Sequence, residues 1–353
     1  MAKYRFDQIA INSTEKKKPV EEDRFTYLGL EHLDSGTLKV TRFGSEVAPI
    51  GEKLVMHKGD VLFGKRRAYQ KKVAIAPFDG IFSAHGMVLR PKEEVVDRDF
   101  FPLFISSDYF LDAAIKISVG SLSPTINWRD LKELEFELPE MDTQRKLAEV
   151  LWSINDTMEA YKRLISATDE LVKSQFMEQF GSIDSEGRFP RKQWNEVLRI
   201  INGRDHKPIS DPSGPYPVYG SGGLMGRATE YLCPENTVVV GRKGTIDKPF
   251  VVTEKFWNVD TAFGVVPNQG VLHYLYLFWY CKQLDFKKLN KASTLPSTTK
   301  EDLLKLWINV PPFERQERFA DFVRQSDKSK FELEQALSEL TATYKRIITE
   351  NLG

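Results

Sequence analysis

The sequence has few of the residues that build metal sites or disulfides. Only two of its 353 residues are cysteine, Cys233 and Cys281, and they form no Cys-x-x-Cys pair. The five histidines form no His-Glu-x-x-His motif or other paired set. Such motifs are the usual signatures of zinc sites and redox centres. We therefore predict no metal site, and reduced thiols with a structural role, as is typical of a cytoplasmic protein.

The chain also lacks an excess of charge and a long apolar run. Lys plus Arg and Asp plus Glu both number 50, so attraction to a polyanion must come from local basic patches. No uncharged apolar stretch reaches the about 18 residues of a membrane span. The first residues, Met1 to Asp7, do not resemble a signal peptide. We expect a soluble protein that neither spans nor enters a membrane.

Known catalytic motifs are missing as well. The segment Asn309-Val-Pro-Pro-Phe313 approaches the Asn-Pro-Pro-aromatic motif of amino-methyltransferases, but Val310 interrupts it. The glycines between Gly220 and Gly226 fit neither the dinucleotide spacing nor the phosphate-binding P-loop. We therefore expect no catalytic residue and no bound cofactor, and interpret the chain as a binding protein.

The most informative feature that is present is an internal repeat. Residues 119–181 recur at 291–353, an offset of 172 positions that pairs Pro124 with Pro296 and Gln144 with Gln316. A repeat of this length indicates two equivalent units on one chain, which suit a target with two parts.

Each copy of the repeat predicts the same succession of elements. A loop of small hydroxyl residues, 120–127 or 292–299, leads into a short helical turn at Asp130 or Asp302. A short strand follows, at 135–138 or 307–310, and ends at a proline. The next stretches, 143–179 and 315–351, contain no glycine or proline and are each closed by a glycine, Gly181 or Gly353. They predict two long helices.

Apolar residues in both helices recur at steps of four and three, the spacing of a coiled-coil seam. Ser326 and Lys330 interrupt the second seam. Helices of about 35 residues extend roughly 50 Å, so mutual pairing would bury both seams; the alternative is that each helix covers only its own domain. The seam residues are Leu147, Leu151, Ile154, Met158, Tyr161, Ile165 and Val172 in the first helix, and Phe319, Val323, Leu333, Leu337, Leu340, Tyr344 and Ile347 in the second.

The predicted fold class is α+β. Two globular α/β units, residues 1–142 and 188–312, are expected to be separated by two long helices, residues 143–181 and 313–353. The helices are expected to pack as an antiparallel coiled coil with approximate twofold symmetry.

Each globular unit carries a basic loop between two expected strands, in residues 59–76 and 235–252. A solvated turn is the simpler interpretation, but recurrence of the charges in the second unit favours a shared anionic ligand, such as DNA. The candidate residues of the first loop are Lys65, Arg66, Arg67, Tyr69, Gln70, Lys71 and Lys72, and those of the second are Arg242, Lys243, Thr245 and Lys248.

Hydroxyl and glycine loops supply further hydrogen-bond donors suited to phosphate oxygens. The candidates for DNA binding in this group are His85, Ser121, Ser123 and Thr125 in the first unit, and Ser221, Gly222, Gly223, Ser293, Thr294, Ser297 and Thr298 in the second. Because the two units differ in their loops, the two halves of the target should differ in sequence.

Three stretches carry a family resemblance: 59–65, 216–226, and 121–127 together with 138–148. Through them nearly the whole chain resembles the DNA specificity subunit of type I restriction-modification systems. The resemblance implies that residues 1–142 and 188–312 are target recognition domains for the halves of a split, asymmetric DNA sequence. It also implies that the long helices, conserved regions of the family, form an antiparallel coiled coil that sets the separation.

The same resemblance implies the partners. Two methyltransferase subunits, and in some systems restriction subunits, would dock on the chain. S-adenosylmethionine, ATP and Mg²⁺ would then belong to those partners, and this chain would be non-catalytic. Two alternatives remain: an adaptor whose duplicated modules bind protein, and a single-chain DNA-modifying enzyme.

Overall fold

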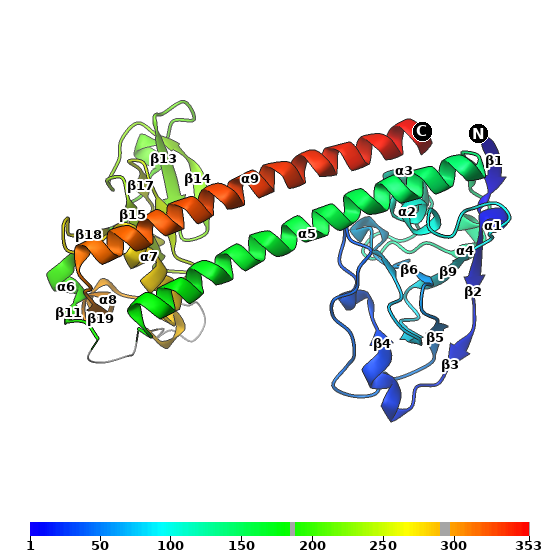
Figure 1. Ribbon diagram of the computed structural model, residues 1–353, viewed down its shortest axis with the longest axis horizontal. Helices are drawn as coiled ribbons and strands as arrows, with labels where there is room; N and C mark the ends of the chain where they lie inside the picture. Colours follow the sequence, from blue (N-terminus) through cyan, green and yellow to red (C-terminus); the bar gives the residue numbers. More distant parts are fainter. Residues whose placement is uncertain (184–187, 290–296, 353) are drawn as a thin grey trace. The chain divides into compact units, whose positions relative to one another are not determined.

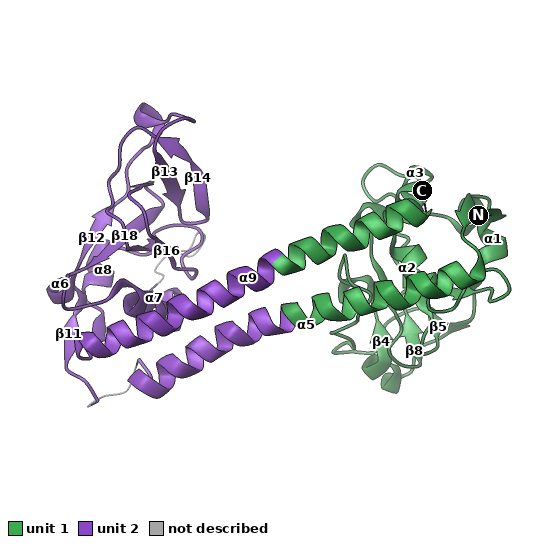
Figure 2. Ribbon diagram, turned by 45° about the horizontal axis from the view of Figure 1, so that its top comes forward, with its two compact units in different colours: residues 1–161, 336–353 green, residues 162–335 purple. Residues whose placement is uncertain are grey.

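The computed structural model describes residues 1–183, 188–289 and 297–352 (Figure 1). The chain divides into two compact units (Figure 2). Unit 1 comprises residues 1–161 and 336–353, and unit 2 comprises residues 162–335. The long helices α5 (Met141–Phe180) and α9 (Phe313–Leu352) each contribute to both units. Each unit therefore contains part of both helices, whereas the sequence suggested domains separate from the helices.

Unit 1 is built on two four-stranded sheets. The first has the order β2-β9-β6-β7 and is antiparallel throughout; the second has the order β3-β5-β8-β4. The strands of the first sheet are Ala10–Ser13 (β2), Met87–Pro91 (β9), Val61–Phe63 (β6) and Val73–Ile75 (β7), and those of the second are Lys16–Lys17 (β3), Lys53–Met56 (β5), Gly80–Phe82 (β8) and Tyr27–Leu28 (β4). A two-stranded pair joins β1 (Ala2–Arg5) to β10 (Glu135–Leu138), and the short helices are Phe6–Ile9 (α1), Phe101–Ser106 (α2), Asp108–Lys116 (α3) and Trp128–Leu131 (α4).

Unit 2 repeats this plan. Its main sheet has the antiparallel order β12-β18-β15-β16, and a three-stranded sheet has the order β14-β13-β17. The strands are Leu198–Asn202 (β12), Ala262–Pro267 (β18), Thr237–Gly241 (β15), Phe250–Val252 (β16), Gly223–Ala228 (β14), Tyr216–Gly220 (β13) and Trp257–Asn258 (β17). A pair of strands, Arg191–Gln193 (β11) and Trp307–Asn309 (β19), and the helices Trp194–Val197 (α6), Tyr274–Gln283 (α7) and Lys300–Leu304 (α8) complete the unit.

The basic segments form the expected hairpins in both units. Strand β6 pairs antiparallel with β7, and β15 pairs antiparallel with β16. Each hairpin joins its main sheet through one further strand, β9 or β18. The duplication inferred from residues 119–181 and 291–353 therefore extends through the globular parts.

Two local breaks interrupt the elements of unit 1. Strands β8 and β9 are separated by a turn. Gly86 in this turn has no room for a side chain, because a Cβ there would lie 2.1 Å from a ring atom of Phe82. Helix α2 ends at Ser106, and the hydroxyl of Ser107 accepts a hydrogen bond from the Phe110 amide and so caps a new helix, α3.

Both long helices contribute to each hydrophobic core. In unit 1, Leu151 of α5 and Ile348 of α9 join an aromatic cluster that includes Phe110 and Phe136. In unit 2, α5 and α9 residues join the cluster around Tyr276: Val172, Phe176, Phe180, Phe319, Ala320 and Val323. Each helix therefore packs into the hydrophobic cores of both units instead of one.

The seam expected from heptad spacing is buried to different degrees. Leu151, Val172, Phe319 and Val323 are buried. The other residues of the seam are partly buried: Leu147, Ile154, Met158, Tyr161, Ile165, Leu333, Leu337, Leu340, Tyr344 and Ile347. The polar interruption at Lys330 has a partner on the other helix, because its Nζ lies 2.9 Å from Oδ2 of Asp169.

The end of α5 has the expected cap. Gly181 follows Phe180 with a φ of 78° and donates its amide to the Met177 carbonyl. Gly353, expected to close the second helix, lies outside the described residues. Within the part of the chain that the structure describes, no helix is both long and apolar enough to span a membrane.

Candidate nucleic-acid interface

In unit 1 the basic loop and the hydroxyl loop meet. The Ile126 amide donates to the Lys65 carbonyl at 2.9 Å, and Arg66 forms an isolated β-bridge with Thr125. The Arg66 guanidinium also donates from Nε to Oγ of Ser123 at 3.1 Å. Two segments about sixty residues apart in the sequence therefore form one surface.

Unit 2 makes the equivalent connection. The Thr298 amide donates to the Arg242 carbonyl at 2.9 Å, and its hydroxyl donates to the Gly241 carbonyl at 3.0 Å. Lys243 forms an isolated bridge with Ser297. Ser293 and Thr294, from the same loop, lie outside the described residues. Both units thus place cationic side chains beside hydroxyl groups, which suits phosphate binding.

A third segment supports the basic loop in each unit. The Arg66 amide donates to the His85 carbonyl, and the Lys243 amide donates to the Thr261 carbonyl, both at 3.2 Å. Burial and the nearby cations Arg66 and Lys65 lower the pKa of His85 below its ordinary value. At neutral pH this imidazole is therefore uncharged and contributes hydrogen bonding to the surface instead of positive charge.

The outer part of the unit 1 loop is a tight turn with exposed side chains. Arg67 and Lys71 have φ angles of 54° and 49°, and they bracket a short 3₁₀ turn, Ala68–Gln70. Such left-handed angles are uncommon outside glycine. The turn exposes Arg67 and Tyr69 on either side of the buried Ala68. A guanidinium can pair with guanine or phosphate, and a tyrosine ring can stack on a base.

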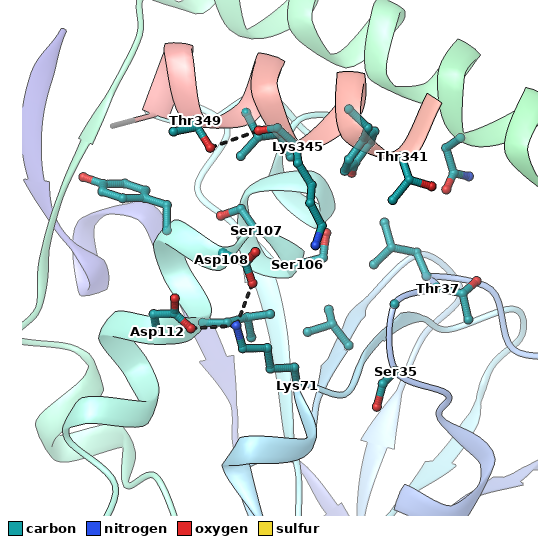
Figure 3. Close-up of a pocket in the computed structure, with 18 of the residues that line it drawn as sticks. Ser35, Thr37, Lys71, Ser106, Ser107, Asp108, Asp112, Thr341, Lys345 and Thr349 are labelled. Carbon is teal, nitrogen blue, oxygen red and sulfur yellow. Dashed lines mark hydrogen bonds and ion pairs between the residues drawn. The ribbon is translucent and has the colours of Figure 1, made fainter. Parts of the chain in front are cut away.

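The last basic residues of this loop face the protein itself. Lys71 donates to Asp108 of α3 and lies 2.6 Å from a carboxylate oxygen of both Asp108 and Asp112 (Figure 3). The hydrogen bond from Lys71 lowers the pKa of Asp108. Lys72 donates to the Leu30 carbonyl at 2.6 Å, and the Gln70 carbonyl accepts from Ser35. These contacts of Gln70, Lys71 and Lys72 hold the loop in place.

The Lys71 ion pairs lie at a cavity of about 820 Å³ within unit 1. Figure 3 shows Lys71 directed toward Asp108 and Asp112, with Lys345 and Thr349 of α9 on the opposite wall. The cavity is therefore lined both by the end of the basic loop and by the last turns of α9.

In unit 2 a glycine hairpin adjoins the basic loop. The Ser221 hydroxyl donates to the Lys243 carbonyl at 2.8 Å, and its amide lies 3.4 Å from the Thr261 hydroxyl. Gly222 lies in the turn of this hairpin and Gly223 begins β14, and both would have open space around an added Cβ. Thr245 is partly buried and Lys248 is exposed farther along the basic loop.

Two cations near the unit 1 surface escaped the sequence analysis. Burial, followed by the charge of Lys16, lowers the pKa of Lys65, and the charge of Lys53 contributes to the lowered pKa of His85. Lys16 and Lys53 come from β3 and β5, which pair in the second sheet of unit 1. The cluster Glu15-Lys16-Lys17-Lys18 was visible in the sequence, but its position beside Lys65 depends on long-range strand pairing.

The described residues contain no group of three or more His, Cys, Asp or Glu side chains that could hold a metal ion. Both cysteines are buried and free. Burial raises the pKa of Cys233 to about 12 and raises that of Cys281 as well. Neither thiol is ionised at neutral pH, so neither is a reactive nucleophile.

A family model described as the type I restriction modification DNA specificity domain matches the chain twice, at residues 19–167 and 192–341. The EcoDI type I restriction enzyme specificity subunit from Escherichia coli is 28% identical over 182 residues, which are 49% of this chain and 40% of that protein. The chain thus spans less than half of that relative. The putative MjaX type I restriction enzyme specificity subunit from Methanocaldococcus jannaschii is 21% identical over 385 aligned positions, covering 94% of this chain and 89% of that protein.

Solved structures share the fold over the whole chain. The S subunit of a type I restriction-modification system from M. genitalium matches with a TM-score of 0.65 and 16% identity, covering 100% of this chain and 96% of its own. A second chain, from a study of complex assembly and conformational transition of the type I R-M system, matches with a TM-score of 0.60 and 18% identity, covering 99% and 97%.

Proposed function

Because the chain belongs to the family of type I restriction-modification DNA specificity domains, we propose that it recognises a bipartite, asymmetric DNA sequence and assembles methyltransferase subunits around it. The chain is a DNA specificity subunit with two target recognition domains. The split target, its asymmetry and the partner subunits are the parts that we add.

One observation carries the proposal: both units build the same surface from three distant segments. Ile126 and Thr298 donate equivalent amides to the basic loops, and Arg66 and Lys243 receive equivalent support from His85 and Thr261. A duplicated frame of this kind suits two similar operations on one ligand.

The exposed chemistry differs between these surfaces. Unit 1 presents Arg66, Arg67 and Tyr69 on a 3₁₀ turn, whereas unit 2 presents Arg242 and Lys243 beside a glycine hairpin. Base edges in the major groove are distinguished by the side chains that reach them. Two unlike surfaces should therefore read two unlike half-sites.

The long helices are proposed to form an antiparallel coiled coil that sets the spacing of the half-sites. Support comes from the seam residues and from the shared cores of each unit, to which α5 and α9 both contribute. The Lys330–Asp169 pair adds a polar contact between the helices inside unit 2. Helices of 40 residues extend about 60 Å, and a coil of that length would span nearly two turns of duplex, at about 34 Å per turn.

Catalysis is proposed to belong to partner subunits. Two methyltransferase subunits would bind S-adenosylmethionine, and restriction subunits, where present, would use ATP and Mg²⁺. This chain would supply sequence recognition and a scaffold, without a cofactor of its own. Its local basic patches on a chain of zero formal net charge would leave tight binding dependent on the partners.

The test combines sequence mapping with a loop variant. Methylated positions are mapped in the genome of a host that carries this chain and its methyltransferase, and the motif found should be split and asymmetric. Arg66→Ala with Arg67→Ala should then lower methylation of the motif by about tenfold or more, because each good base contact contributes about 1–3 kcal/mol.

The matched control is Arg318→Ala on α9, whose side chain is 70% exposed and lies outside both loops. It should leave DNA binding by the purified chain unchanged. An adaptor would instead bind neither random duplex nor the mapped motif, and a single-chain enzyme would transfer labelled methyl groups without a partner.

A further inference from the structure

The β13–β14 hairpin of unit 2 exposes two neighbouring apolar side chains. Leu224 is 65% exposed and Met225 is 59% exposed. Single exposed apolar residues are common on protein surfaces and need no explanation. Here, however, two large ones are consecutive in the sequence, close to the turn of a hairpin that consists of Ser221 and Gly222.

The end of the hairpin is exposed and carries a bulge. Tyr219 pairs with Leu224 and Val218 pairs with Gly226, so Met225 has no cross-strand partner. Leu224, Met225, Gly226 and Arg227 are all exposed, and the Met225 sulfur lies over Gly220, where an added Cβ would be 2.7 Å from it. An added Cβ would have open space at Gly222, Gly223 and Gly226, so the end is thin as well as apolar.

The position of this apolar end is set by the basic loop. Ser221, the first residue of the turn, donates its hydroxyl to the Lys243 carbonyl at 2.8 Å. A Cβ added at Gly244, in the basic loop, would lie 3.7 Å from the same Ser221 hydroxyl. The apolar end and the cationic loop therefore belong to one continuous surface.

Unit 1 combines the same two features through a different element. Leu122 is 95% exposed and lies in the hydroxyl loop. Its neighbour Ser123 accepts a hydrogen bond from the Arg66 guanidinium at 3.1 Å. Each unit thus places an apolar side chain next to the cations expected to bind phosphate.

We propose that Leu224 and Met225 act as a wedge that inserts between base pairs of the half-site bound by unit 2, with Leu122 as its counterpart in unit 1. This inference rests on the proposed function. Proteins that insert Leu, Met or Phe between base steps unstack them and bend the duplex by roughly 20–90°. The flanking cations hold the backbone while the wedge enters.

A protein partner fits the same patch less well. Two side chains on a thin hairpin offer far less than the about 800 Å² per partner of a stable protein interface. The adjacent cations Arg242 and Lys243 favour a polyanion, and a base step accepts a wedge of this size.

The wedge adds sequence selectivity without hydrogen bonds to bases. Pyrimidine–purine steps unstack most readily, so a wedge prefers TA and CA/TG steps. We therefore expect such a step in the half-site of unit 2, at a position where substitution by a stiffer step weakens binding although no side chain contacts the base edges.

The experiment uses the full chain, alone and assembled with its methyltransferase, and duplexes that carry the mapped motif. Affinity and bending are measured by fluorescence anisotropy and by energy transfer between dyes at the duplex ends. A second set of duplexes carries a nick at successive steps of the unit 2 half-site. A nick at the wedge position removes most of the unstacking cost.

Leu224→Ser with Met225→Ser should weaken binding to intact duplex by roughly tenfold, the scale of removing the burial of one large aliphatic side chain. Bending should fall in parallel. The unaltered protein should gain affinity from one particular nick, and the double variant should lose that gain. Leu224→Phe alone, which keeps a large apolar side chain at this position, should bend the duplex as the unaltered protein does.

The control is Phe331→Ala, which removes a 58% exposed apolar side chain from α9 and should leave both measurements unchanged. Thermal unfolding of every variant checks that the hairpin change does not alter the fold. Unchanged bending and nick dependence in the double variant would overturn the wedge. So would loss of methyltransferase assembly with normal bending, which would make the patch a protein contact.

A different result would overturn the proposed function itself. In that case the unaltered chain and its complex would bind no duplex that carries the motif, and the wedge proposal would be wrong as well. Normal binding by the unaltered protein, with no bending at all, would overturn the wedge and leave the proposed function intact.

Discussion

Gln144 and Gln316 make the same three hydrogen bonds in the two units. The Gln144 side chain accepts from the Asp97 amide and donates to the carbonyls of Val95 and Pro139, at 2.8–3.1 Å. The Gln316 side chain accepts from the His273 amide and donates to the carbonyls of Val271 and Pro311, at 2.8–3.0 Å.

Both side chains are buried, at 1% and 0% exposure. Gln144 connects the first turn of α5 to the segment before α2, and Gln316 connects the first turn of α9 to the segment before α7. Each glutamine side chain therefore fixes the start of a long helix against the globular part of its unit.

Replacing Gln144 by Ala should destabilise unit 1. The change leaves one amide and two carbonyls without their partner, and a buried unsatisfied group costs about 1–3 kcal/mol. Urea unfolding should show a lower midpoint, with Gln316→Ala giving the same effect in unit 2. Gln325→Ala, at an exposed position of α9, is the control, and equal midpoints for Gln144→Ala and this control would refute the coupling.

Removing cations from the basic loop should change the salt dependence of DNA binding. Each lost phosphate contact should reduce the slope of log K against log salt by about 0.9. Lys65→Ala with Arg66→Ala and Arg67→Ala should therefore flatten the slope without unfolding the chain, as measured by anisotropy and thermal unfolding. An unchanged slope would show that these residues do not contact phosphate.

The Lys71 ion pair should contribute a pH-dependent term to stability. Its hydrogen bond lowers the pKa of Asp108 from the ordinary 3.8. A carboxyl with a depressed folded pKa contributes stability above its unfolded pKa and loses it as the pH falls through the folded value.

We therefore expect Lys71→Met to reduce stability at neutral pH and to flatten its decline below about pH 4. Because Asp108 is more than half exposed, solvent screening keeps the effect small. Thermal unfolding across a range of pH measures this effect. The comparison is Lys116→Met on α3, the helix that carries Asp108. Parallel pH curves for Lys71→Met and the unaltered chain would exclude the effect.

Lengthening both long helices should lengthen the tolerated spacer in the DNA target. One heptad added after Tyr161 and one after Gln335, where the chain passes between its compact units, extends each helix by about 10 Å. That distance corresponds to about three base pairs.

Methylated sites mapped in a host with the lengthened chain should show the same half-sites with a longer gap. Addition of a heptad to α5 only is the control and should abolish methylation, because the seams lose register. An unaltered motif in the doubly lengthened protein would refute the spacing role of the helices.

Much of this structure could be predicted from local patterns in the sequence. The absence of Gly and Pro over 143–179 and 315–351 predicted α5 and α9 because helix formation depends on near neighbours. The hairpins β6–β7 and β15–β16 were predicted by apolar strands around a polar turn. The equivalence of Gln144 and Gln316 followed from the offset of 172 positions, although their hydrogen bonds did not.

Other features depended on contacts between distant segments. No pattern in the sequence indicates that Lys16 and Lys53 lie near Lys65 and His85, because the pairing of β3 with β5 places them there. The seam spacing likewise did not include Phe176 and Ile348, whose burial depends on the cores they enter.

The amino-acid order was sufficient for the duplication, the long helices and the basic hairpins, since each depends on residues close together in the chain. Which cations face outward was decided by the folded units: Arg66 and Arg67 remain exposed, while Lys71 is held by Asp108 and Asp112. Identical charges in one loop thus acquire different roles, because ion pairing depends on distances that only packing establishes.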